Sequence, residues 1–113
     1  MTKKYLEKLS KLMKSSAPSR FKNTELVIKH FFNGAAVYAN KKICITLTPV
    51  GFGLKLPEHI RNTLIKKNGA KHLRYFPEGH IKKDYVILSN VMLNDMKILQ
   101  QLIKKSIEYV TRL

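Results

Sequence analysis

The sequence predicts an α+β fold in which an antiparallel sheet carries packed helices, in the order α-β(3)-α-β(2)-α. Segments at both ends of the chain repeat apolar residues at the spacing of one helical face, whereas the middle alternates apolar and polar residues as strands do. Proline and glycine stand between the alternating segments, where turns need them. At 113 residues the chain has the length of one domain, so we expect residues 1–113 to share a single core.

The first helix is expected to begin after Thr2, a residue type that suits an N-cap. One of its faces is apolar, and the other carries lysines. A basic amphipathic helix of this kind can lie on an anionic membrane surface, or it can pack its apolar stripe on the core; we favour packing. The apolar stripe consists of Tyr5, Leu6, Leu9, Leu12 and Met13, and the lysines are Lys3, Lys4, Lys8 and Lys11.

A three-stranded antiparallel meander is predicted next, built from "GAAVY", "ICITLT" and "FGLKL". In the second of these, Ile43, Ile45 and Leu47 alternate with Cys44, Thr46 and Thr48, as in a half-buried strand. Pro49 and Gly51 supply the following turn, because proline presets φ and glycine accepts positive φ.

The segment 29–43, "KHFFNGAAVYANKKI", is interpreted as strand, turn, strand. No helix is expected after Gly34, and the chain contains neither GxxxxGK[ST] nor GxGxxG, so the glycine does not predict a phosphate-binding loop. We instead expect the Asn33-Gly34 step to mark a bulge or a close backbone approach.

The second half of the chain predicts helix, hairpin, helix. Pro57 and Glu58 suit a helix start, and Gly69 suits the C-terminal cap. The segments "AKHLRYF" and "HIKKDYVIL", joined by "PEG", predict a hairpin. Ser89 is expected to open a short helical turn, and Asn94 to cap a final helix. The predicted buried face of that helix is Met96, Leu99, Leu102, Ile103, Ile107 and Val110.

The chain is strongly basic, with 22 Lys and Arg against 7 Asp and Glu and a formal net charge of +15. Such a charge favours an anionic partner, nucleic acid first and an acidic protein surface next. Lysine-rich composition alone is the competing explanation. No apolar run reaches the roughly 20 residues that span a bilayer, and neither a secretory signal nor a cysteine pair is present. We therefore expect a cytoplasmic protein that does not associate with membranes.

The sequence does not predict catalysis, a metal site or a cofactor. Cys44 is expected to be a small buried residue without reactivity. The four histidines, His30, His59, His72 and His80, lack the spacing of metal ligands. Acidic residues are scarce, and several of them suit helix starts or turns, so a general acid–base pair is not expected.

A set of basic residues is the candidate site for a polyanion or partner. Lysines at helix ends also complement the helix dipole, and lysines on strands protect sheet edges, so these roles compete with binding. If the residues share one side, they form a face that contacts phosphates without reading base sequence. The set is Lys41, Lys42, Lys66, Lys67, Lys71, Arg74, Lys82 and Lys83.

Three segments carry a family resemblance: "FFNGAAVYANKKI", "GFGLKLPEHIRNTLIKKNGAKHLRYFPEGHIKKDYVIL" and "SIEYV". From about Glu25 to Val110 the chain resembles the N-terminal domain of the TfoX/Sxy competence-regulator family, with Asn33 where the family usually has glycine. The residues taken as its structural motif are Phe32, Gly34, Tyr38, Gly69, Tyr75, Gly79 and Tyr85.

The resemblance implies an α-β(3)-α-β(2)-α domain and a regulatory role. Longer members carry a C-terminal domain resembling helix-hairpin-helix DNA binders, which we expect this chain to lack since it ends at Leu113. We therefore expect a non-enzymatic bacterial module that regulates by binding another protein, at sheet edges or helix grooves. The alternative is a small basic protein that binds nucleic acid non-specifically. The sequence leaves the oligomeric state open.

Overall fold

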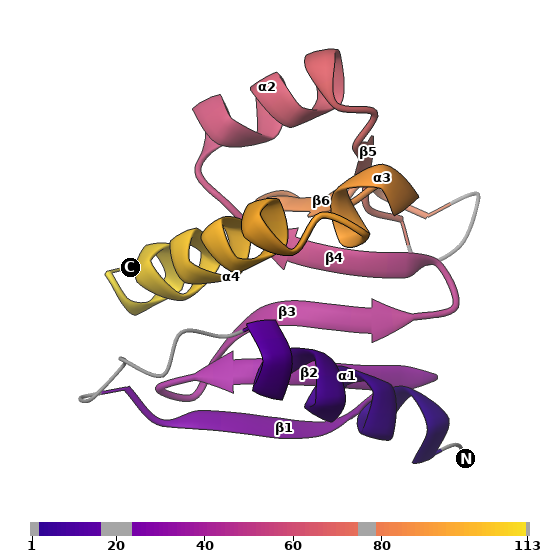
Figure 1. The fold of residues 1–113 in the computed structure, drawn as a ribbon, viewed down its shortest axis with the longest axis vertical. Coiled ribbons are helices and arrows are strands. Elements are labelled where there is room, and N and C mark those ends of the chain that lie inside the picture. The colour runs from indigo at the N-terminus through magenta and orange to yellow at the C-terminus, as the bar shows by residue number, and fades with distance from the viewer. Residues whose placement is uncertain (1–2, 17–23, 75–78, 113) are drawn as a thin grey trace.

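The computed structural model describes residues 3–16, 24–74 and 79–112 and confirms an α+β fold with an antiparallel sheet and packed helices (Figure 1). Four helices and six strands follow one another within these described residues. They are α1 (Lys3–Ser16), β1 (Leu26–Phe31), β2 (Gly34–Ala39), β3 (Lys42–Thr48), β4 (Gly51–Lys55), α2 (Glu58–Lys67), β5 (Lys71–His72), β6 (Tyr85–Ile87), α3 (Asn90–Leu93) and α4 (Met96–Thr111).

The six strands form one sheet in the order β1-β2-β3-β4-β6-β5, and every neighbouring pair is antiparallel. The opening meander therefore has four strands, one more than the three that we expected before the middle helix. The additional strand is β1, in which Leu26 and Ile28 pack against the core while Lys29 and His30 are exposed. Its apolar residues are only half-buried because β1 lies at the edge of the sheet.

The turns of the meander follow the chemistry of their residues. Asn40 and Lys41 join β2 to β3 with φ of 50° and 70°, the combination of a type I′ hairpin turn. The Asn40 side chain accepts a hydrogen bond from the Glu25 N–H at 2.8 Å, which ties the start of β1 to this turn. Pro49 and Val50 join β3 to β4, and Gly51 follows with φ of 127°, as the turn prediction required.

Helices α1 and α4 lie side by side across the same face of the sheet (Figure 1). Leu9 of α1 and Ile103 and Ile107 of α4 are fully buried against Leu54 and its neighbours in the sheet. The apolar stripe of α1 is therefore docked on the core, as favoured from the sequence. Because the stripe of α1 is used in this way, its lysines are left on the opposite, exposed face.

The strand β3 is more deeply buried than a half-buried strand, which corrects the sequence interpretation. A register shift between Val37 and Tyr38 opposite β3 places Cys44 in the same core cluster as Ile45. Thr46 is also fully buried, and the register sets it between Ala36 and Gly53, where a Cβ at residue 53 would lie 3.0 Å from the Thr46 hydroxyl. This register shift is a bulge. The alternation of apolar and polar residues in β3 did not reveal it, because one extra residue turns a side chain to the face opposite to the one that strict alternation predicts.

Two further details differ from the sequence predictions. The second hairpin is short, because Asp84 takes φ of 74° and the Lys82 N–H bonds the Leu73 carbonyl at 2.8 Å, so Lys82 and Lys83 lie in a loop. Asp95, and not Asn94, caps α4 by accepting from the Ile98 N–H at 3.2 Å. Met96 is consequently the first residue of the helix and is exposed.

Candidate partner-binding cavity

A cavity of about 490 Å³ lies where three connections of the chain meet. The β1–β2 turn, the β3–β4 turn and the loop that precedes β6 each contribute to its lining. The described residues that line it are Phe32, Asn33, Thr48, Pro49, Val50, Gly79, His80 and Lys82. Its volume falls within the roughly 300–1,000 Å³ typical of ligand pockets.

The lining combines an apolar part with a basic part. Phe32, Pro49 and Val50 supply apolar surface from the two turns, whereas the loop supplies the ammonium group of Lys82 and the imidazole of His80. Thr48 holds the β3–β4 turn in place, because its hydroxyl accepts a hydrogen bond from the Val50 N–H at 3.3 Å. No acidic side chain is among the described residues of the lining, so the cavity suits an occupant with apolar and anionic groups.

Phe32 has the most unusual backbone conformation in the cavity. Its φ is 51°, in the left-handed region that costs a non-glycine residue about 1–2 kcal/mol and that Asn or Gly occupies more easily. Its side chain is nevertheless 76% exposed, with the ring 4.5 Å from that of Phe31 between centroids. A large aromatic residue at a strained, exposed turn is a poor choice for folding alone.

Exposed apolar residues gather around this cavity. Val50 is 38% exposed in the β3–β4 turn, and Ile81, which is 43% exposed, lies within the loop that lines the cavity. The edge strand β1 ends beside it at Phe31. Apolar groups concentrated at one end of a sheet mark an interaction surface more often than scattered ones do.

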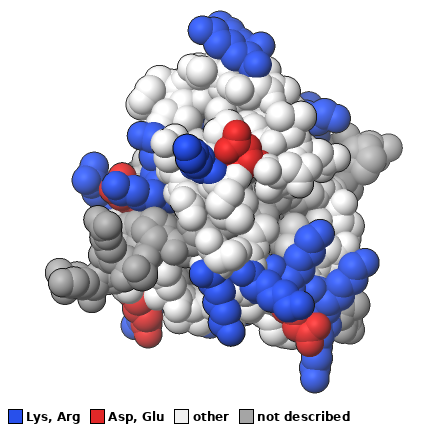
Figure 2. Space-filling view, in the orientation of Figure 1, with Lys and Arg blue, Asp and Glu red and all other residues white. Residues whose placement is uncertain are grey.

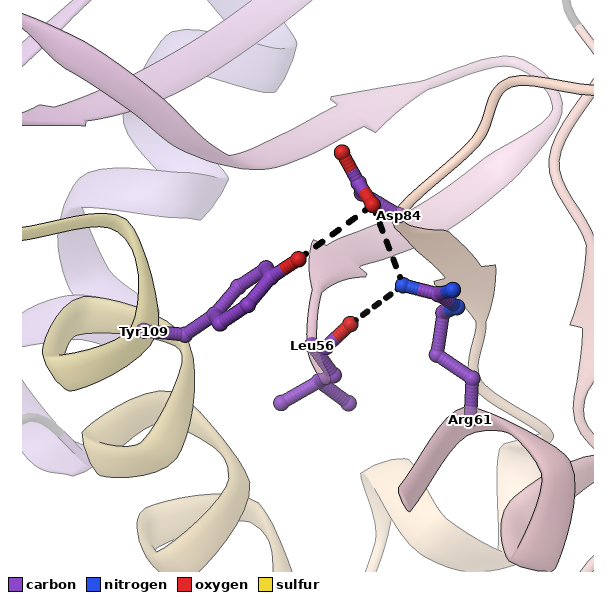
Figure 3. A network of polar contacts seen from close by, with 4 residues as sticks. All are labelled: Leu56, Arg61, Asp84 and Tyr109. Atoms are coloured by element: carbon purple, nitrogen blue, oxygen red, sulfur yellow. Dashed lines mark hydrogen bonds and ion pairs between the residues drawn. The ribbon is translucent and has the colours of Figure 1, made fainter. Parts of the chain in front are cut away.

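A polar network fixes the opposite side of the fold, where α2 and α4 meet the end of β4 (Figure 3). Arg61 of α2 donates to the Leu56 carbonyl at 2.6 Å and to the Asp84 carboxylate at 3.2 Å. The Tyr109 hydroxyl of α4 donates to the same carboxylate at 3.3 Å. These three hydrogen bonds join α2 and α4 to the segment between β4 and β6.

The buried thiol of Cys44 is not set up as a nucleophile. Burial raises its pKa to about 12, although Lys55, a backbone hydrogen bond and Ser106 act in the other direction. Its Sγ lies 3.4 Å from the Val37 carbonyl. Among residues 3–16, 24–74 and 79–112, no three His, Cys, Asp or Glu side chains gather as metal ligands. The expectation of a non-enzymatic protein remains a prediction.

Most of the basic residues singled out from the sequence lie around β5. Lys66 and Lys67 end α2, Lys71 lies in β5 and Arg74 follows it, while the Lys82 N–H bonds the adjacent Leu73. Lys41 and Lys42 lie apart from these, because β4 and β6 separate β3 from β5 in the sheet. All eight side chains are exposed.

The positive charge is divided among several regions on the side shown in Figure 2. Basic side chains gather over α1 and beside the C-terminal end of α4, and others lie on α2, with mostly uncharged surface between them that carries a few single charged groups. The described helices are also too short or too polar to cross a membrane.

The structural-motif residues serve different purposes. A Cβ at Gly34 would overlap the Leu47 carbonyl oxygen, which confirms the close backbone approach, and Gly69 follows α2 with φ of 75°. Gly79 lines the cavity, as does Phe32. Tyr38 and Tyr85 each lie under a lysine, Lys29 and Lys55 respectively, with Nζ 5.4 Å from the ring centroid in both cases. Tyr75 is outside the described residues.

Sequence reasoning missed the role of Pro49, Val50 and His80 in the cavity. A usable signal was present, since Phe32 and Val50 are large apolar residues at the tips of turns, where polar residues are more common.

Comparison with known proteins finds no family model that matches the chain, and no curated protein or solved structure with significant similarity.

Proposed function

We propose that this protein is a non-enzymatic binding module that recognises another protein through the cavity at Phe32. The observation that carries the proposal is the exposed aromatic side chain held at a positive φ beside a cavity of about 490 Å³. The Phe32 ring packs on Phe31 but remains mostly exposed, so a partner would gain a large apolar anchor. Aromatic anchors of this type are enriched among the residues that dominate interface energies.

The partner segment proposed is acidic and carries at least one large apolar side chain. Its apolar group would enter between Phe32, Pro49 and Val50, and its carboxylates would face His80 and Lys82. The net charge of +15 adds a long-range attraction that speeds association with an acidic partner. An extended segment can also pair with β1, which is an edge strand ending next to the cavity.

A regulatory role would be exercised through this contact. The resemblance to the TfoX/Sxy N-terminal domain supports such a role, in a bacterial cytoplasm and in the control of competence genes. The cavity would provide the contact for such regulation, because a partner segment can bind there without any chemical reaction. The cavity does not favour nucleic-acid binding at the basic residues around β5, since its lining is partly apolar.

Site-specific photo-crosslinking tests the proposal. A benzoylphenylalanine in place of Phe32 is expected to capture an acidic segment of one protein when irradiated in a native lysate. The matched control replaces Val91 of α3, which is 78% exposed and does not line the cavity. Equal labelling from positions 32 and 91, or capture of nucleic acid alone at position 32, would contradict the proposal. The captured segment is then synthesised for affinity measurements.

A further inference from the structure

Helix α1 carries five lysines, all exposed, and one acidic residue, Glu7. With about 100° of rotation per residue, the five lysines fall within an arc of about 140° on the helix surface. That arc lies opposite Leu9 and Met13, which are buried in the core. The lysines are Lys3, Lys4, Lys8, Lys11 and Lys14.

These lysines form a straight basic ridge on a rigid element. From Lys3 to Lys14 the helix advances about 16 Å, at 1.5 Å per residue. In double-stranded DNA each strand winds around the axis, so successive phosphates lie farther apart than their axial rise of about 3.4 Å, and a straight ridge of this length reaches about three phosphates on one side of the duplex. The ridge therefore offers at least one lysine for each phosphate within its reach.

The ridge is unfavourable in the unbound protein. Lys3 and Lys4 lie in the first turn of α1, where no acidic residue is present and the helix dipole repels positive charge. Lys4 and Lys8, four residues apart, also repel each other across one helical turn. Lys66 and Lys67 differ in this respect, because they end α2 and complement its dipole. The helix dipole thus explains the lysines that end α2, and Lys14 in the last turn of α1, but not Lys3 and Lys4.

The packing of α1 on the sheet favours a nucleic acid over a lipid membrane as its anionic partner. A membrane-bound amphipathic helix inserts its apolar face into the lipid, but here that face is occupied by the sheet, with Leu9 fully buried. Most of the exposed side chains of α1 are lysines, with Glu7 and Ser15 beside them. The lysine ammonium groups lie on flexible stems and contact phosphates as point charges. Contacts of that kind fix a protein on a nucleic acid without reading its base sequence.

We infer that the lysine ridge of α1 binds the phosphodiester backbone of a nucleic acid, as a second surface separate from the Phe32 cavity. Neutralising about three phosphates predicts a slope of log affinity against log salt of about −3 on duplex DNA. The binding is expected to be independent of base sequence. The inference goes beyond the proposed protein contact and does not depend on it.

Fluorescence anisotropy of a labelled DNA duplex, titrated at several salt concentrations, tests the ridge. The test variant combines Lys4→Gln, Lys8→Gln and Lys11→Gln, and the charge-matched control combines Lys66→Gln, Lys67→Gln and Lys71→Gln. The α1 variant is expected to flatten the slope by about two to three units and to weaken binding about 100-fold near 0.1 M salt. The control variant is expected to change the slope by less than about one unit.

Several outcomes would overturn the inference. These are no duplex binding by the wild-type protein, equal effects of the two triple variants, or binding to phosphatidylserine vesicles that depends on α1 while duplex binding does not. Phe32→Asn provides the link to the proposed function. This variant should leave the affinity for the DNA duplex unchanged and lower the affinity for the crosslinked segment. The two measurements therefore test the lysine ridge and the Phe32 cavity independently.

Discussion

Replacing Gly34 with alanine should destabilise the protein strongly, because the first residue of β2 lies against the backbone of β3. An added Cβ would overlap the Leu47 carbonyl oxygen and lie 2.8 Å from the Thr48 Cα, where ordinary contacts begin at 3.4 Å. Both obstructing atoms belong to the main chain, so a side-chain rotation cannot make room. The two strands must separate at this point.

The size of the effect follows from what that separation disrupts. Overpacking in a tight site costs about 1–3 kcal/mol, and weakening one or two hydrogen bonds between β2 and β3 adds about 1 kcal/mol each. We expect a loss of about 3 kcal/mol in the free energy of unfolding. For a domain of this size, that loss lowers the melting temperature by about 12 °C or more.

Urea denaturation followed by circular dichroism measures this loss directly, and Gly69→Ala is the matched control. Gly69 also has a positive φ, of 75°, but a Cβ there meets nothing closer than the Ser89 Cβ at 3.8 Å. Its replacement should cost only about 1 kcal/mol, the conformational term alone. If Gly34→Ala costs no more than Gly69→Ala, the close approach of β2 and β3 does not constrain residue 34.

Two further predictions concern the β2–β3 turn and the buried thiol. Lys41→Gly should raise the free energy of unfolding by about 0.5–1 kcal/mol, because residue 41 has φ of 70° in a type I′ turn that favours glycine; an unchanged or lower value in urea denaturation would refute this. Cys44 should resist thiol reagents in the native state at pH 8, since burial raises its pKa to about 12. Above pH 9 the folded state retains a proton that the unfolded chain releases. The contribution of the thiol to the free energy of unfolding is therefore fully present below pH 9 and is lost as the pH rises toward 12. Wild-type protein should therefore lose more stability over that interval than Cys44→Ala, and parallel pH profiles of the two proteins would contradict the assignment.

The periodicity of the sequence was sufficient for the fold class and for most of the helices. The spacing of Leu9 and Met13 predicted the docked face of α1, and that of Leu99 to Val110 predicted the face of α4. Strand details were harder to obtain, because register and bulges depend on neighbouring strands. The displacement of Cys44 onto the core face comes from a register shift against Val37 and Tyr38, two residues that the alternation of β3 does not include.

The cavity was not predictable from local patterns, since it forms only when three connections far apart in sequence are brought together. The sequence did show Phe32 and Val50 as apolar residues near turns, but not that His80 would face them. The basic residues were evident in the sequence, but the sequence did not show which of them serve binding and which stabilise the fold. Only the structure distinguishes lysines that complement a helix dipole, as at the end of α2, from those that oppose one at the start of α1.

The affinity of the crosslinked partner segment for Phe32→Asn tests the central claim most directly, namely that Phe32 serves binding rather than folding. Loss of the aromatic anchor, which the partner is proposed to bury, should cost about 2 kcal/mol, or about 30-fold in Kd. The free energy of unfolding should stay the same or rise, because Asn accepts a φ of 51° more easily than Phe. Val91→Asn should leave the affinity unchanged. A Phe32→Asn variant that is less stable but binds the segment as tightly as wild type would contradict the account.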